Sequence, residues 1–458
     1  MTDEKADLLQ RFLGWARILI PLVGILLVVL QWWQNAQLMS EAVSANHAMR
    51  QIWTNHPPAF PLDTLTDALY VPTAVSPLGA FDPGEGTWLA QSVWMQLTRI
   101  ARGQDQLGYD IFPSGRQVGL SAATFAQLII PSLAIILAWR QTRAAKSLSL
   151  QSWTSLQTSL IEFSGPTVAL GCLLTATLQR QSLGVEGAIR LMLVLGAYVL
   201  YCLAAGTICW LVFNITPSLS RATGILVLFW LFNFSLARPL TVNLAALAFP
   251  LPGIDAYAKR LDFEINNGYN GVESRNDRQR RFFSEILRDY KVSTPGEVPV
   301  NVSALALQKE ERHQREVGSR LRAEIDAIFA NQERLEQVLS MAFPLVAIQI
   351  SSSALSATDF ASERYQLLEA DRFWDQIVNK VYHDVAVTSG PLAQRTLRGS
   401  DYWSQFPFFE AKIPSPFLAL VACGFPAFGL FLCAAAGIFA SFNFTRPPAS
   451  PASSEETA

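Results

Sequence analysis

The chain has 458 residues, of which 50% are apolar and only 16% are charged, and its mean hydropathy is +0.24. Such a balance is rare in a soluble protein of this length and is typical of an integral membrane protein. The net charge of -2, with acidic and basic residues interleaved, excludes the broad electrostatic attraction that nucleic-acid-binding proteins use. We therefore expect a membrane protein that does not bind nucleic acid.

Six apolar runs are long enough for membrane-spanning helices, which need about 20 residues. They cover residues 13–33, 118–139, 165–183, 189–213, 221–249 and 415–442. The fifth run is too long for one straight crossing and contains Arg238-Pro239. We predict that it forms a spanning helix at 221–237, followed by a second apolar helix at 239–249 along the far interface.

Basic residues in the short loops predict the orientation, because such residues accumulate on the cytoplasmic side. They occur before the first run, after the second, between the fourth and fifth, and after the last: Lys5, Arg11, Arg17, Arg140, Arg143, Lys146, Arg221 and Arg446. With an even number of spans these regions share one side. We expect a multi-pass protein of the bacterial cytoplasmic (inner) membrane with both termini in the cytoplasm.

The predicted fold class is an all-α integral membrane protein, with six transmembrane helices and a large, mainly helical extracytoplasmic domain. In chain order we expect a cytoplasmic N-terminus and first helix (1–33), a first extracytoplasmic segment (34–117), helices two to five with a cytoplasmic loop at 140–164 (118–250), the large extracytoplasmic domain (251–413), the sixth helix (414–442) and a disordered cytoplasmic tail (443–458).

The segment 251–413 carries more than half of the charges in about a third of the length. Charged residues at i, i+4 spacing predict helices near 255–267, 275–290, 303–341 and 361–385. From Ser340 to Thr358 the sequence becomes apolar and Ser-rich. This stretch is too short and too polar for a seventh span, so we expect it to pack against the membrane-proximal surface.

Motifs for catalysis or metal binding are not found. The sequence has no G-x-x-x-x-G-K-[ST] phosphate loop, no G-x-S-x-G elbow and no paired histidines. We therefore predict no catalytic, cofactor-binding or metal-binding residue, and no enzymatic activity in this chain.

Two places attract attention for other reasons. In the loop at 140–164, Leu148, Trp153, Leu156, Leu160 and Ile161 fall near one helical face, which predicts either an anchor on the membrane surface or a docking site for a partner. Arg238 is flanked by apolar residues on both sides. It is either a charge that extends to the interface, or one that lines a translocation path or pairs with a lipid head group.

Several short motifs occur in a characteristic order along the chain: Ser76-Pro77-Leu78, Asp82-Pro83-Gly84, Phe249-Pro250-Leu251-Pro252, Val298-Pro299-Val300-Asn301, Leu307-Gln308 with Glu310-Glu311, Ala357-Thr358-Asp359-Phe360 and Glu369-Ala370-Asp371-Arg372. Together with the six apolar runs, they resemble the permease subunits of ABC-2 type ABC transporters. The resemblance is to the subfamily with a large extracytoplasmic domain, known as domain of unknown function 3526.

The resemblance implies a membrane-spanning permease subunit, an exporter, powered by a separate cytoplasmic ABC ATPase that holds the ATP. It also implies a second permease chain, in a homodimer or a heterodimer, and contact with membrane lipid. The ATPase-coupling residues would be Arg143, Lys146, Trp153 and Leu156 in the cytoplasmic loop. The alternative is a non-transporting membrane scaffold, whose extracytoplasmic domain recruits or activates a periplasmic protein.

Overall fold

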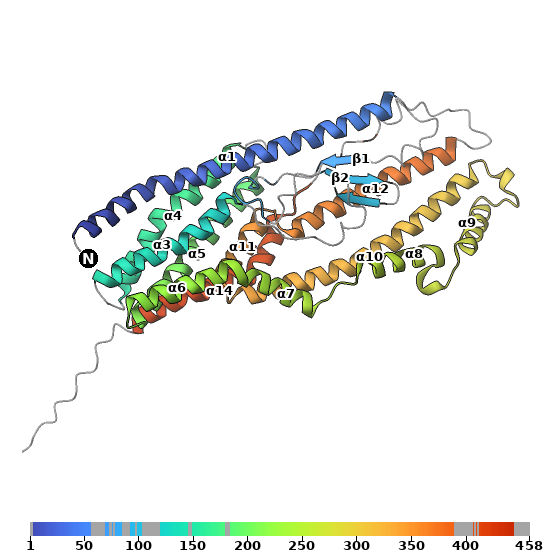
Figure 1. The fold of residues 1–458 in the computed structure, drawn as a ribbon. Helices are drawn as coiled ribbons and strands as arrows, with labels where there is room; N and C mark the ends of the chain where they lie inside the picture. The colour runs from blue at the N-terminus through green and yellow to red at the C-terminus, as the bar shows by residue number, and fades with distance from the viewer. Residues whose placement is uncertain are drawn as a thin grey trace, which may run out of the picture.

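The computed structural model describes residues 3–55, 69–72, 76, 78–84, 92–96, 99–102, 120–144, 149–178, 184–388, 406, 409 and 412–443. Within these residues the fold is mainly helical, as predicted, with three short strands in addition. The molecule is elongated: a bundle of apolar helices forms one half and a helical domain projects from it (Figure 1).

Six helical segments among the described residues are long and apolar enough to cross a membrane, which confirms the predicted number. They are Gly14–Gln37, Ala122–Arg143, Leu150–Leu178, Val185–Ile215, Leu219–Ala248 and Pro416–Phe442. The corresponding helices are α1 (Asp3–Asn55), α3 (Ala122–Ala144), α4 (Leu150–Leu178), α5 (Val185–Ile215), α6 (Leu219–Phe232) with its continuation, and α14 (Pro416–Asn443).

The third helix begins earlier than the sequence indicated. A cytoplasmic loop at 140–164 was predicted, but α4 already begins at Leu150 and continues through Pro166. Its first turns expose Ser, Gln and Thr side chains on one face and bury apolar ones on the other. The helical face predicted within this loop is therefore the start of α4. Only the boundary of the third apolar run was placed too late, because a hydropathy criterion stops at polar residues even when the helix does not.

The fifth helix also differs from the prediction. Residues 239–249 do not form a separate helix, because α6 continues through a π-helical turn, η2 (Asn233–Ala237), into α7 (Arg238–Ala248). Pro239 has no N–H, and its ring would collide with the carbonyl of Ser235 in a regular α-helix. The wider π turn accommodates the proline without ending the helix.

The projecting domain consists of four helices, the far part of α1 and a small sheet (Figure 1). The helices are α8 (Ile254–Asn267), α9 (Arg275–Asp289), α10 (Val302–Ser340) and α12 (Phe360–Thr388). The sheet has the order β1-β2-β3, all antiparallel, with β1 (Leu69–Pro72), β2 (Ser92–Gln96) and β3 (Arg99–Arg102). The sheet lies between α1 and α12.

Residues 340–358 enter the bundle instead of lying on its surface, which corrects the prediction for this stretch. The C-terminal part of α10, a turn at Met341–Phe343 and α11 (Pro344–Leu355) form a helical hairpin. The turn lies against Gly429, at the middle of α14, where an added Cβ would be only 2.6 Å from Cα of Met341. Only glycine permits this close approach.

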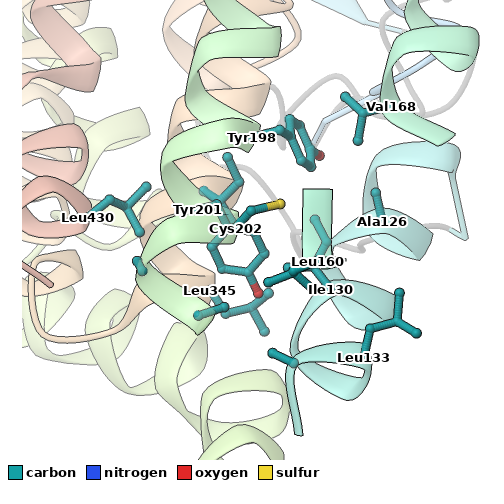
Figure 2. Close-up of a cluster of buried hydrophobic side chains, with 14 of the residues drawn as sticks. Ala126, Ile130, Leu133, Leu160, Val168, Tyr198, Tyr201, Cys202, Leu345 and Leu430 are labelled. Carbon is teal, nitrogen blue, oxygen red and sulfur yellow. The ribbon is translucent and has the colours of Figure 1, made fainter. Parts of the chain in front are cut away.

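The hairpin is part of the main hydrophobic core. Leu345 and Ile348 of α11 are fully buried together with side chains of α3, α4, α5 and α14. Figure 2 shows Leu345 near Tyr201 of α5 and Leu430 of α14. Close packing of such side chains stabilises helices inside a membrane, so apolar contacts hold the short α11 in place.

Candidate functional site

Two of the short sequence motifs, about 270 residues apart, meet at the boundary between the bundle and the projecting domain. The segment 76–84 packs against the C-terminal end of α11 and the turn that leads into α12. We call this place the junction: Ser76, residues 78–84, residues 349–359 and the side chains of α3, α5 and α7 that contact them.

Asp82 lies at the centre of the junction. Its Oδ1 accepts a hydrogen bond from the backbone N–H of Gly84 at 2.9 Å, and its Oδ2 accepts one from the hydroxyl of Ser352 in α11. The Ser352 hydroxyl also lies 3.4 Å from the Tyr198 hydroxyl of α5. Gln127 of α3 donates to Tyr198 at 3.2 Å. A chain of polar contacts therefore runs from the segment 76–84 through α11 and α5 to α3.

Backbone geometry fixes the same contact. Gly84 has φ of +63°, and a Cβ at this position would lie 2.3 Å from the carbonyl oxygen of Thr358. Both the conformation and the space require glycine. The Ser76 hydroxyl donates to the carbonyl of Ser356, next to this contact. The motif residues Gly84 and Thr358 thus fit together directly, and Pro83 between Asp82 and Gly84 is buried.

Arg190 of α5 joins the junction to the bundle, and it was not among the residues predicted to be functional. Its side chain is 1% exposed. It donates to the carbonyls of Leu355, at 2.9 Å, and of Pro414. Its charge also attracts Asp359. A basic residue inside an apolar helix was the signal that could have identified it.

The two junction carboxylates differ from surface carboxylates in protonation. Burial raises the pKa of Asp82, and the hydrogen bonds from Ser352 and Gly84 oppose this effect. Burial also raises the pKa of Asp359, against the hydrogen bonds from Ser362 and the charge of Arg190. Burial outweighs these contacts at both positions, so both carboxyl groups hold their protons more strongly than surface carboxyls do.

Arg238 contacts the hairpin instead of a free interface. Its Nη1 donates to Oε1 of Gln349 in α11 at 3.4 Å, and its charge is attracted by Glu336 and Asp82. Glu336 is itself buried, on the part of α10 that enters the bundle. Arg238 therefore positions α10 and α11 relative to the fifth helix.

The motif residues of the projecting domain have structural surroundings. Asn301 caps α10 by accepting from the N–H of Ala304 at 3.1 Å, two residues after the exposed Pro299. Gln308 donates to the carbonyl of Asn379 at 3.3 Å, across to α12. Glu369 and Arg372 form an i, i+3 ion pair in which Arg372 is exposed. Pro250 and Pro252 separate α7 from α8.

Glu311 is the unusual residue of this group. It is 6% exposed, and its Oε1 has no hydrogen-bond partner among the described residues. Burial raises its pKa to about 7, with a further increase from the charge of Glu310 and an opposing effect of Arg315. Tyr382 of α12 faces it closely enough for the two groups to interact electrostatically.

The predicted coupling residues are not all at the surface. Trp153 and Leu156 are buried, at 8% and 0% exposure, and the Trp153 indole donates to Thr207 of α5 at 3.0 Å. They cannot offer a docking surface, which corrects that part of the prediction. Arg143 is exposed at the end of α3, with its guanidinium 5.3 Å from the Trp139 ring centroid. Lys146 and Pro77 lie outside the described residues.

The junction connects the apolar bundle to the projecting domain through side-chain and backbone hydrogen bonds. Among the residues that the structure describes, no group of three or more His, Cys, Asp or Glu side chains could hold a metal ion. What the junction offers is a set of directional bonds between the bundle and the projecting domain. These bonds link α5 to α11, and α12 begins five residues after α11 ends.

These features define a helical protein with the six apolar helices of a multi-pass membrane protein and a large helical insert between the fifth and the sixth. Residues 258–412, which make up most of that insert, match the family described as Domain of unknown function (DUF3526). No curated protein and no solved structure matches the chain. The matched segment contains Pro299, Asn301, Gln308, Glu311, Thr358, Asp359, Glu369 and Arg372.

Proposed function

We propose that this chain is the membrane-spanning permease subunit of an ABC-2 type ABC transporter, that it acts as an exporter and that a separate ATPase subunit powers it. The observation that carries the proposal is the position of the DUF3526 segment, between the fifth and sixth apolar helices. The distribution of basic loop residues supports a bacterial inner membrane location, with the projecting domain extracytoplasmic.

The first turns of α4 supply a surface on which the ATPase can dock. One face of these turns exposes only polar side chains, Gln151, Thr154, Ser155, Thr158 and Glu162. Helices that face lipid are apolar, so an exposed polar face favours contact with water or protein. We call these five residues the polar face of α4. It replaces Trp153 and Leu156 as the proposed coupling surface.

Neighbouring helices are tied to this face. Arg17 of α1 forms an ion pair with Glu162 at 3.3 Å, and Gln141 of α3 donates to Ser155 at 3.1 Å. On the buried side, Trp153 and Gln157 bond to α5. A force on the polar face therefore reaches α5, and through Arg190 it reaches the junction. In this mechanism ATP binding moves the helices and the projecting domain together.

The test is to purify the chain with an ABC ATPase encoded next to it and to measure ATP hydrolysis in proteoliposomes. We expect the permease to stimulate hydrolysis severalfold. Thr154→Arg with Thr158→Arg should remove at least four fifths of the stimulation by blocking the polar face. Ser284→Arg, at an exposed position of α9, is the matched control and should leave it unchanged. Full stimulation of the double variant would contradict the coupling surface.

A second candidate function, the membrane scaffold, is favoured by one observation. Phe263, Tyr269 and Val272, around the end of α8, are exposed at 49%, 55% and 83%. Apolar side chains that gather in an exposed loop favour contact with another protein. A scaffold would bind a periplasmic protein through 251–413 and lose that binding in Val272→Glu. A transporter would instead move a solute into or out of vesicles only when ATP is supplied.

A further inference from the structure

A cavity of about 340 Å³ lies where the projecting domain meets the sixth apolar helix. This volume is in the range of small-molecule binding pockets. One wall is apolar and comes from α14, with Leu418, Ala419 and Ala422. The other wall comes from α10 and α12 and includes Asp326, Arg364 and Tyr365. The surface of the cavity is therefore mainly apolar, and its polar residues all come from the side of α10 and α12, which we call the polar wall.

The two walls lie at different depths along the bundle. Met341, at the end of α10, contacts Gly429 in the middle of α14, and we use this contact as the origin from which positions along both helices are measured. Measured along each helix at 1.5 Å per residue, Ala422 is about 10 Å from the origin, Leu418 about 16 Å and Asp326 about 22 Å. The hydrocarbon of a bilayer ends about 15 Å from its middle, and the headgroups end about 20–22 Å from it.

With the middle of α14 placed at the middle of the bilayer, the apolar wall falls at the outer end of the hydrocarbon and the polar wall falls in the headgroup layer. Leu418 is 57% exposed, so the apolar wall reaches the surface that lipid would cover. A molecule that fills this cavity has its apolar part toward the middle of the bilayer and its polar part outward. A phospholipid of the surrounding membrane has this form.

The charges of the polar wall select the headgroup. The guanidinium of Arg364 is already paired, because it donates to Oε2 of Glu333 at 2.7 Å and to the carbonyl of Asp326 at 3.1 Å. The Asp326 carboxylate accepts no hydrogen bond from any described residue, and its ion pair with Arg364 is long, at 3.9 Å. A carboxylate with unused acceptor positions fits a primary ammonium group, which has three donors.

We propose that this cavity binds one phospholipid with a primary-amine headgroup, with an acyl chain against Leu418 and Ala422 and the ammonium group at Asp326. The phosphate then lies beside Arg364. The bound lipid fills the gap between α14 and the projecting domain, so it belongs to the boundary at which movement would be transmitted. This site is independent of whether the chain transports a solute.

Native mass spectrometry of the full chain in mild detergent tests the proposal. The probes are palmitoyl-oleoyl phosphatidylethanolamine and palmitoyl-oleoyl phosphatidylglycerol, added separately. We expect the wild type to retain one phosphatidylethanolamine at least fivefold more strongly than phosphatidylglycerol. Ala422→Trp should weaken retention at least tenfold by filling the apolar end. Val421→Trp, one residue away and 76% exposed, is the matched control and should bind as the wild type does.

Asp326→Asn tests the headgroup without changing the size of the side chain. It should reduce retention of phosphatidylethanolamine to that of phosphatidylglycerol, whereas Asp289→Asn, at an exposed position of α9 outside the cavity, should have no effect. Equal retention of the two lipids by the wild type would overturn the proposal, as would unchanged retention by Ala422→Trp. If Ala422→Trp melts well below the wild type, Asp326→Asn decides: an unchanged preference for phosphatidylethanolamine would overturn the proposal.

Discussion

Among the residues that the structure describes, the bundle and the projecting domain each contain one fully buried arginine side chain, and the two side chains are stabilised in different ways. Arg190 in the bundle bonds to the backbone carbonyls of Leu355 and Pro414. Arg278 in the projecting domain forms two 3.0 Å hydrogen bonds with the carboxylate of Glu310, which is itself 5% exposed. The bundle thus holds its charge with backbone dipoles from two segments, whereas the domain uses a hydrogen-bonded partner of opposite charge.

The difference teaches how each region can tolerate change. A pair of charges can be replaced together by apolar side chains at little cost. Backbone carbonyls cannot be removed by substitution, so no second substitution can compensate for the loss of Arg190 in the bundle. The junction should therefore be the less replaceable part of the molecule.

The largest expected effect comes from Arg190→Met. It leaves two buried carbonyls without their donor and removes the cation near Asp359. We expect the free energy of unfolding to fall by about 3–5 kcal/mol, as when a buried charge loses its partner. Thermal melting followed by size-exclusion chromatography measures it, with the exposed Arg221→Met as control. A melting temperature like that of the wild type would contradict the role of Arg190 as the connection between bundle and domain.

The second prediction concerns Arg278, where a second substitution should reverse most of the loss of stability caused by the first. Arg278→Met should also cost about 3–5 kcal/mol, because it leaves the buried Glu310 with only the longer ion pair to Arg275, at 3.5 Å. Adding Glu310→Leu should restore most of this loss. About 1 kcal/mol should remain, because the carbonyl of Ile265 also loses its bond to Arg278. A double variant as unstable as Arg278→Met alone would remove the contrast between the two arginines.

The smallest effect depends on pH and belongs to the domain. The pKa of Glu311 is about 7 in the folded protein and about 4.5 in the unfolded chain. The folded state therefore binds more protons between these values, and wild-type stability should fall as the pH rises from about 4.5 to about 7. Glu311→Gln should be more stable than the wild type by up to about 3 kcal/mol above pH 7, with no gain below about pH 4.5.

Melting curves between pH 4 and pH 8 measure this gain. Glu316→Gln, at an exposed position of the same helix, is the control and should follow the wild type at every pH. A constant difference between Glu311→Gln and the wild type would show that packing, and not ionisation, distinguishes the two side chains.

The sequence predicted local features well and long-range ones poorly. Apolar runs of about 20 residues identify spanning helices because the requirement is local. The start of α4 was not recognised because its first turns carry polar side chains. Pro239 suggested a break in the fifth helix, but the π-helical turn η2 accommodates the proline. The hairpin of α10 and α11 was missed because only its contacts with α5 and α14 make twelve Ser-rich residues stable inside a bundle.

The candidate site shows the same division. Asp82, Gly84, Thr358, Asp359 and Arg238 were identified from motifs and from charge in an apolar setting. Their meeting at one junction could not be predicted, because Asp82 and Ser352 are separated by 270 residues. Arg190 was not identified, although it is a basic residue in an apolar run, because the sequence does not show which neighbours bury its side chain.

One long element gives the molecule a mechanical property. α1 is a single helix of 53 residues that continues from the bundle along the projecting domain (Figure 1). At 1.5 Å per residue it is about 80 Å long, so pivoting it by about 5° at one end displaces the other by about 7 Å. Such a rod acts as a lever arm. A rearrangement too small to open a path among the apolar helices becomes a displacement of side-chain size at the far end of the protein.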